Sequence, residues 1–227
     1  MCIRDSLLHI VDNAISPSVM KALSQTPPQR PWYGFARFTG QLADEGFCVA
    51  LKRAGCVMLK LGLESGDQAI LDGLHKGNDL EMVSRILGNL KRNGIATYVY
   101  LLFGTPDESL GEAQKTLDFV ARHSSFLDFL NIAIFNLPHN SPDSEHLVTS
   151  QFYEGDLSLY SNFIHPRGWG RRQVRQFLAK EFKRHPAIVP IIQRDPPFFT
   201  SNHAPFFAMM GIPVSYTHLT LPTKRIV

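Results

Sequence analysis

VMLKLGLESG, from Val57 to Gly66, is the stretch that decides the fold of this chain. Its apolar run is too short to span a membrane and predicts a buried strand, and the ESG turn leads into the helical pattern DQAILDGL. A parallel strand of this kind places Glu64 at its carboxyl end. In α/β folds the loops at that end of the sheet gather over the ligand, so other candidate residues are judged by whether they reach the same edge.

Size and composition predict a folded chain with a substantial core. The 227 residues are 44% hydrophobic, which suits one domain or one domain with an appendage. Because 23 basic and 20 acidic residues leave a net charge of +3, charge indicates neither a nucleic-acid nor a membrane partner. There is no 18-residue apolar run and no signal region, so we expect a cytoplasmic protein.

Both ends of the chain lack the periodicity of a folded segment. Residues 1–6 (MCIRDS) and 214–227 (VSYTHLTLPTKRIV) resemble translated sequencing adapters, so we expect non-native tails there. Between them we expect a partial barrel over residues 7–147 and a C-terminal extension over residues 148–213. On this interpretation the natural protein extends beyond this sequence in at least one direction.

Strand-like and helix-like segments alternate along the first two thirds of the chain. Five segments predict strands: residues 7–13, 32–38, 57–66, 95–104 and 126–138. Helical patterns lie between them, with Ser16 as an N-cap and Gly55 as a terminal glycine. This alternation predicts an α/β fold: a partial (β/α) TIM-like barrel of about five parallel strands with an irregular α-rich C-terminal extension.

Three details of the helices are also predicted. In the helix over residues 110–123, one stripe should face inward, formed by Leu110, Ala113, Leu117 and Val120. In the helix over Gly170–His185, apolar residues should pack on the barrel while the basic side chains form a solvated face. These apolar residues are Val174, Phe177, Leu178 and Phe182. RDPPFFTSNHAPFF, residues 194–207, predicts a folded-back loop because of its proline and aromatic content.

The third and fourth strands carry motifs that occur together in a known family. GCxxLxLGLESG is followed by HKG, KRNGI, YLLFGTPDES and IFNLP, in this order. Together they resemble the C-terminal half of the radical S-adenosylmethionine core, most closely in members with an upstream cobalamin-binding domain. The resemblance covers about Leu7 to Leu147.

The resemblance implies an iron-sulfur enzyme. In this family a [4Fe-4S] cluster held by a CxxxCxxC loop cleaves S-adenosylmethionine to a 5′-deoxyadenosyl radical, which abstracts hydrogen from the substrate. That loop is absent here, and Cys2, Cys48 and Cys56 cannot replace it because their spacing does not bring three thiolates together. We therefore expect the full-length protein to be an enzyme and this chain alone to be inactive, with no metal ligand and no catalytic residue of its own.

The family also implies partners. An electron donor such as ferredoxin or flavodoxin is expected, and the likeness of the LGLESG and FGTPDES stretches suggests cobalamin in the full-length protein. The substrate, a small molecule or a peptide, does not follow from the sequence.

Four candidate cofactor-binding residues surround the third strand. The resemblance implies that Glu64 accepts hydrogen bonds from the ribose hydroxyls of S-adenosylmethionine, and the alternative is an N-cap for the next helix. Lys76 matches the position that pairs with the cofactor carboxylate, or it answers the helix dipole. Arg37 could bind the same carboxylate or pair with Glu64. Ser65 either shapes the turn or contacts the cofactor.

Five further candidates lie on neighbouring strand ends. Gly104 and Thr105 match a turn whose backbone lies against the adenine, and Glu108 in this turn is expected to cap its helix. The resemblance implies that Asp12 and Asn13 lie where the second strand of the family's barrel meets the amino group of the cofactor. The alternative is that they cap the loop. Asn136 lies at the rim of the last strand, where it could contact the substrate or the cofactor.

Two other functions remain open. The chain could be a cluster-free α/β domain that binds a ligand or a partner, and the upstream reading frame distinguishes this from the enzyme by the presence of CxxxCxxC. An ordinary barrel enzyme with a phosphate site is also conceivable, but no glycine-rich phosphate cradle is evident.

Overall fold

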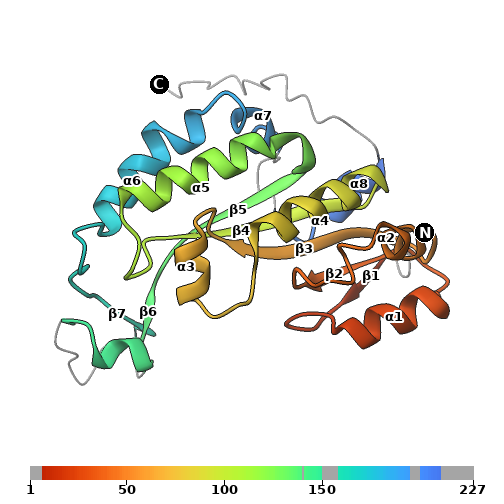
Figure 1. Cartoon of the computed structure of the whole chain (residues 1–227), viewed down its shortest axis with the longest axis horizontal. Coiled ribbons are helices and arrows are strands. Elements are labelled where there is room, and N and C mark those ends of the chain that lie inside the picture. The colour runs from red at the N-terminus through yellow and green to blue at the C-terminus, as the bar shows by residue number, and fades with distance from the viewer. Residues whose placement is uncertain (1–6, 140, 150–157, 195–199, 211–227) are drawn as a thin grey trace, which may run out of the picture.

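A five-stranded parallel sheet with strand order β1-β2-β3-β4-β5 forms the centre of the protein (Figure 1). The computed structural model describes residues 7–139, 141–149, 158–194 and 200–210, so both predicted tails and the strand-like QFYEG at residues 151–155 lie outside the described residues. The strands are β1 (Leu8–Ile10), β2 (Trp32–Ala36), β3 (Cys56–Glu64), β4 (Ala96–Phe103) and β5 (Phe129–Ile134). Every neighbouring pair is parallel, which confirms the predicted α/β class, and among the described residues the sheet is open and forms no closed barrel.

Helices connect the strands in the predicted alternation. They are α1 (Pro17–Gln25), α2 (Glu45–Arg53), α3 (Gln68–Gly73), α4 (Leu80–Arg92) and α5 (Leu110–Arg122). Each begins after a residue whose side chain accepts a hydrogen bond from the first turn: Ser16, Asp44, Asp67, Asp79 and Ser109. Each helix begins directly after its capping residue. The caps therefore determine where the preceding loops end.

The main core lies between the sheet and these helices. Successive residues of β3 point to opposite faces, so Leu59, Leu61 and Leu63 are fully buried on the helix side. Lys60 and Gly62 belong to the other, inner face. The inner face has its own small cluster, which includes Tyr33, Met58, Tyr98 and Phe129.

The remaining elements belong to the C-terminal half. A short antiparallel pair joins β6 (Leu137–Pro138) to β7 (Tyr160–Ser161), beside the 3₁₀ turn η2 (Pro142–Glu145), and η1 (Ser124–Phe126) precedes β5. The predicted helix over Gly170–His185 is shorter than expected, because α6 (Arg171–Lys180) ends before η3 (Phe182–Arg184). Its predicted apolar side chains, from Val174 to Phe182, are buried in the main core beside α7 (Val189–Ile192).

Two predictions about helices are wrong. Residues 204–210 form the helix α8 (Ala204–Met210) rather than a loop, since Pro205 stands in the first turn, where proline is tolerated. This helix contacts β3 and β4 from the inner face. Leu110 is 42% exposed, because it is the first residue of α5 and helical side chains point toward the N-terminus, beyond the helix end. Thr116 and Phe119 complete the buried stripe of α5 instead.

Candidate functional site

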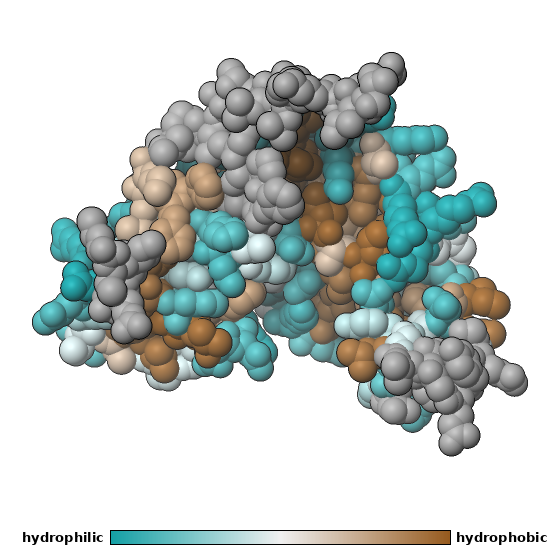
Figure 2. All heavy atoms as spheres, turned by 180° about the vertical axis from the view of Figure 1, so that it is seen from behind, coloured by the Kyte–Doolittle hydropathy of each residue, from teal (hydrophilic) through white to brown (hydrophobic). Residues whose placement is uncertain are grey.

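The carboxyl ends of β1 to β4 enclose a cavity of about 290 Å³ on the inner side of the sheet. Seen from behind, the surface is hollowed between the lobe that holds β1 and α1 and the lobe that holds β6 and β7 (Figure 2). Four of the predicted cofactor-binding residues line this cavity: Asn13, Arg37, Glu64 and Lys76. Phe35, Asn78 and Tyr100 line it as well, and the sequence did not single them out. The parallel strands thus bring residues from three loops to one edge of the sheet.

Glu64 is held over the cavity floor by an unusual backbone. Its φ of 69° lies in the left-handed region, which costs a non-glycine residue about 1–2 kcal/mol. The pairing of β3 with β4 shifts register between Gly62 and Glu64, so the side chain turns back over Gly62. A Cβ added at Gly62 would lie 2.7 Å from Oε1 of Glu64, and only glycine leaves that space open.

The Glu64 carboxylate forms an ion pair with Lys76. The distance from Nζ of Lys76 to Oε1 is 2.5 Å, and the side chains of Lys76 and Glu64 are 48% and 14% exposed. The alternative roles of both residues do not hold: Asp67 caps α3 by accepting from the Ile70 amide, and Lys76 lies beyond the last turn of that helix. Both charged groups therefore face the cavity.

Arg37 and Asn78 flank this ion pair. The predicted alternative of an Arg37–Glu64 pair is absent, because Lys76 occupies the carboxylate. Arg37 is exposed and makes no hydrogen bond or ion pair to any described residue, which leaves its guanidinium available for an anion. Asn78 is 6% exposed and donates from Nδ2 to the carbonyl oxygen of Gly62 at 3.0 Å, so it fixes the strand end beneath Glu64. In the sequence, the only indication of this role is that Asn78 is a polar residue directly after the HKG motif.

Ser65 shapes the turn and does not line the cavity. It is 1% exposed, its hydroxyl lies 3.1 Å from Oγ1 of Thr116, and it accepts from the amide of Asp67. Gly66 packs so closely on α5 that an added Cβ would lie 2.7 Å from the Thr116 Cα. The ESG turn is thereby fixed to α5.

The other candidates lie in neighbouring hollows. Asp12 lines an open hollow of about 510 Å³ that shares Asn13 and Phe35 with the main cavity. Gly104 and Asn136 line a hollow of about 70 Å³, where Asn136 accepts a hydrogen bond from Arg171. Thr105 lines a third hollow of about 470 Å³ that extends to the end of α3. These residues reach the predicted edge of the sheet, although not the cavity of Glu64.

Glu108 does not cap α5, contrary to the prediction. Ser109 is the cap, in a capping box with Glu112. Glu108 is instead fully buried, and its Oε2 accepts from the amide of Gly104 and from Nε1 of Trp169, the latter at 2.9 Å. Its Oε1 has no hydrogen-bond partner among the described residues. Burial raises the pKa of the Glu108 carboxyl group to about 7.

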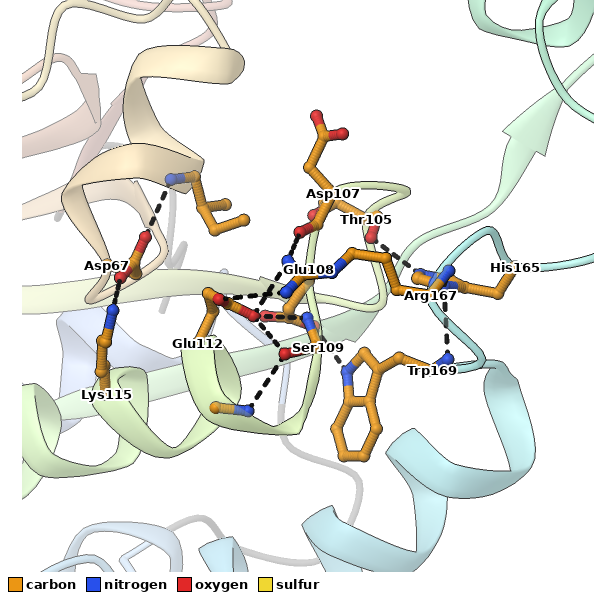
Figure 3. Close-up of polar contacts among 12 residues, drawn as sticks. Asp67, Thr105, Asp107, Glu108, Ser109, Glu112, Lys115, His165, Arg167 and Trp169 are labelled. Carbon is orange, nitrogen blue, oxygen red and sulfur yellow. Dashed lines mark hydrogen bonds and ion pairs between the residues drawn. The ribbon is translucent and has the colours of Figure 1, made fainter.

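Three side chains of the extension point toward the turn after β4 (Figure 3). His165 lies with Nε2 at 2.9 Å from the carbonyl oxygen of Thr105. Its Nδ1 accepts from the amides of Arg167 and Trp169, so this network assigns the proton to Nε2, which donates to Thr105. Arg167 donates to the carbonyl oxygen of Asp107 at 2.5 Å, while Trp169 donates to Glu108. No motif in the sequence predicts these long-range contacts.

The described cysteines do not form a metal site. Cys48 and Cys56 are fully buried in the main core, and burial raises the pKa of Cys48 to about 11 and that of Cys56 further. No group of three potential metal ligands occurs among the described residues. The thiols of this part of the chain therefore do not suit a [4Fe-4S] cluster.

Comparison with known proteins gives partial matches. No protein-family profile matches the chain. Over 72 residues it is 35% identical to bacteriochlorophyllide d C-12(1)-methyltransferase of Chlorobaculum tepidum, which covers 31% of this chain and 16% of that protein. Over 85 residues it is 31% identical to anaerobic magnesium-protoporphyrin IX monomethyl ester cyclase of Rubrivivax gelatinosus, 37% of this chain and 15% of that protein. The chain thus spans about one sixth of the length of these relatives.

Two solved structures superpose on a little over half of the chain. A radical S-adenosylmethionine methyltransferase, TsrM from Kitasatospora setae with cobalamin and a [4Fe-4S] cluster bound, superposes with a TM-score of 0.49 at 19% identity, over 58% of this chain and 28% of TsrM. The radical enzyme coproporphyrinogen III oxidase of Escherichia coli gives 0.48 at 16% identity, over 57% of this chain and 32% of that enzyme. No helix in the described part of the chain is long and apolar enough to cross a membrane. The sequence matches thus cover about a third of the chain, and the structural matches a little over half of it.

Proposed function

We propose that this chain contributes the S-adenosylmethionine side of the active site of a radical S-adenosylmethionine enzyme. The observation that carries the proposal is the cavity at the carboxyl ends of β1 to β4, where Arg37, Glu64 and Lys76 converge. The cavity offers two carboxylate oxygens and two cationic groups, which match the ribose hydroxyls and the carboxylate of S-adenosylmethionine. The partial sequence matches support the same class of enzyme.

The residues take distinct roles in this proposal. Glu64 accepts the ribose hydroxyls, and Arg37, which has no described partner, binds the methionine carboxylate. Lys76 is half exposed and can leave Glu64 for the same carboxylate when the ligand binds. Asn13 in the same cavity receives the amino group of the cofactor, and Phe35 and Tyr100 exclude water from one side.

The turn after β4 holds the adenine in this proposal. The backbone of Gly104 and Thr105 is fixed by Glu108 and His165, so it does not have to be ordered when a ligand binds. Asp12 and Asn136 stand at the two ends of the same edge of the sheet and contact the outer parts of the ligand.

The [4Fe-4S] cluster belongs to residues outside this chain. When bound with S-adenosylmethionine, the cluster supplies the electron that generates the 5′-deoxyadenosyl radical. Because the described thiols do not fit the cluster, we propose that this chain alone is inactive. The complete enzyme is proposed to be cytoplasmic. An upstream cobalamin domain and reduction by a ferredoxin or flavodoxin complete the proposal.

We further propose a tetrapyrrole as the substrate class. Both sequence relatives act, by name, on a bacteriochlorophyllide or on magnesium-protoporphyrin monomethyl ester. The matched lengths of 72 and 85 residues support a shared scaffold. The proposal covers methyl transfer and ring formation alike, because one relative is a methyltransferase and the other a cyclase.

Calorimetric titration of the complete protein with S-adenosylmethionine tests the proposal. Glu64→Ala should weaken binding at least tenfold, because two charge-assisted hydrogen bonds are lost. Glu81→Ala removes an exposed carboxylate at the start of α4 and should leave the affinity unchanged. An unchanged affinity in Glu64→Ala would remove the assignment of Glu64.

The second candidate function is a cluster-free domain that binds a ligand or partner. The observation that favours this second function is that Cys48 and Cys56 are buried free thiols, and no group of potential metal ligands occurs among the described residues. Three cysteines spaced CxxxCxxC in the upstream reading frame would exclude it. Their absence would favour it over the enzyme.

A further inference from the structure

Six exposed cations lie on the outer side of α6 and η3. They are Arg171, Arg172, Arg175, Lys180, Lys183 and Arg184, and we call this surface the basic face. The opposite side of α6 is buried in the main core, and the helix lies at the periphery of the molecule (Figure 1). None of the six forms an ion pair with a described residue, whereas exposed cations on α4 such as Lys91 and Arg92 do.

Positive charge is concentrated in the C-terminal extension. Residues 158–213 contain eight basic residues and two acidic ones, Glu181 and Asp195. Of the 23 basic and 20 acidic residues of the chain, 15 basic and 18 acidic ones lie outside this segment. Arg167 pairs with Glu112, and if both acidic residues of the segment were paired as well, five positive charges would remain there. The positive field of the basic face therefore does not depend on the placement of any one acidic residue.

The first turn of α6 runs against the helix dipole. Three other helices, α2, α4 and α5, carry a glutamate in the first turn: Glu45, Glu81 and Glu112. The helix α6 has no acidic residue there and begins with Arg171 and Arg172. Cations at this end of a helix are unfavourable, and so is the like-charged pair of Arg171 and Arg175 four residues apart. A local conflict of this kind is expected where a surface serves binding rather than stability.

The basic face begins at the edge of the sheet where the proposed cofactor site lies. Arg171 donates to Asn136, which follows β5, and both line the hollow that contains Gly104 at the end of β4. Arg172 and Arg175 lie within one turn of Arg171. An anionic partner on these arginines therefore stands beside the carboxyl ends of the strands.

The surroundings of the basic face favour a compact acidic protein as this partner. The apolar side of α6 is buried in the core, so the helix has no apolar face to insert into a membrane. The exposed residues of α6 and η3 include no aromatic side chain on which single-stranded bases could stack. A long duplex would reach past the basic face to the acidic remainder of the chain, which repels it. The arginine side chains suit carboxylates, because a guanidinium can bind a carboxylate through two hydrogen bonds.

We propose that the basic face docks an acidic protein, the electron donor of the proposed enzyme. Complementary charges steer the donor to the basic face and orient it there. The docked donor is oxidised by one electron, and this electron reduces the cluster of the complete protein. The inference rests on the proposed function, because the cleavage of S-adenosylmethionine is the step that consumes the electron.

The bland alternative is that the six cations serve solubility alone. In that case the charge of the whole chain, and not the position of the arginines, would determine how strongly an acidic protein binds. Two variants with the same change in net charge at different places separate the two interpretations. One is the double substitution Arg172→Glu and Arg175→Glu on the basic face. The other is Lys21→Glu and Arg85→Glu, which reverses exposed cations on α1 and α4.

The test measures binding of oxidised flavodoxin, a small acidic protein, to the full chain by biolayer interferometry at low and high salt. The wild type should bind, and more weakly at high salt. The basic-face variant should bind roughly tenfold more weakly or worse, and the control variant should stay within about twofold of the wild type. Thermal unfolding should show that the basic-face variant is no less stable than the wild type, because glutamates near the start of α6 suit the helix dipole.

Three outcomes overturn the proposal. They are an equal loss of flavodoxin binding in both variants, no binding by the wild type, and binding of a DNA duplex or of phosphatidylserine vesicles in place of flavodoxin. Arg172 and Arg175 lie outside the cavity of Glu64, so S-adenosylmethionine affinity of the complete protein is an independent measurement. A loss of the docking surface with intact cofactor binding is thereby distinct from failure of the cofactor assignment.

Discussion

Replacing Glu108 by glutamine should make the stability of the protein less sensitive to pH between pH 5 and 8. Glu108 is fully buried, and one oxygen accepts from both the Gly104 amide and the Trp169 indole. Glutamine keeps an accepting oxygen for both donors and removes the charge. The variant therefore isolates the cost of burying an ionised carboxylate.

The magnitude follows from the raised pKa of Glu108. Burial raises this pKa from its ordinary value of 4.5 to about 7, so the folded state binds a proton more tightly than the unfolded state. Folding stability therefore falls as pH rises from about 4.5 through 7 and levels off above that. A shift of this size corresponds to about 3 kcal/mol between the two ends of the range.

Urea unfolding at pH 5, 6, 7 and 8 measures the effect. The difference in free energy of unfolding between Glu108→Gln and the wild type should grow in favour of the variant by about 2.5 kcal/mol between pH 5 and pH 8, since part of the full effect is already lost at pH 5. Glu112→Gln is the matched control. Hydrogen bonds from Ser109 lower the pKa of Glu112 to about 2, so its charge is constant over the same pH values. A difference for Glu108→Gln that stays constant from pH 5 to pH 8 would refute the reasoning.

Two further predictions concern glycine positions and the backbone of the site. Gly66→Ala should lower the free energy of unfolding in urea by about 2–3 kcal/mol, because the added Cβ would lie 2.7 Å from the backbone of α5. The control is Gly40→Ala, whose Cβ meets no atom within 4 Å, and it should change the free energy of unfolding by no more than about 0.5 kcal/mol. An equal effect of the two substitutions would contradict the close packing of the ESG turn. Glu64→Gly should leave the free energy of unfolding unchanged or raise it by up to about 1 kcal/mol, because it relieves a left-handed residue, while S-adenosylmethionine binding by the complete protein is lost. A clear loss of stability in Glu64→Gly would show that the Lys76 ion pair outweighs the backbone cost.

The sheet was predictable because its signals are local. Short apolar runs alternate with helical patterns, and caps such as Ser16 fix where helices begin. The loop prediction at residues 204–207 failed for a physical reason. Proline and aromatic residues disfavour a helix in isolation, but contact with the inner face of β3 and β4 stabilises α8.

The site was predictable only in part. Arg37 and Glu64 lie together because parallel strands share one edge, and Lys76 joins them from the loop between α3 and α4. The role of Glu108 could not be inferred, since it depends on Trp169, which is 61 residues away in the chain. Burial of Lys60 was equally hidden, because the sequence shows a lysine in a strand and not the segment that covers it.

The extension is tied to the candidate site by polar contacts as well as by the core. His165 and Trp169 hold opposite ends of the turn that begins at Gly104, and Val174 lies close enough that a Cβ at Gly104 would approach its Cγ2 to 3.2 Å. Ser201 and Asn202 cover the inner face behind the cavity. Residues after β5 therefore determine the shape of two sides of the site. A deletion that removes them would expose the Lys60 ammonium and release the turn after β4, so the isolated sheet cannot be expected to reproduce the binding properties of the chain.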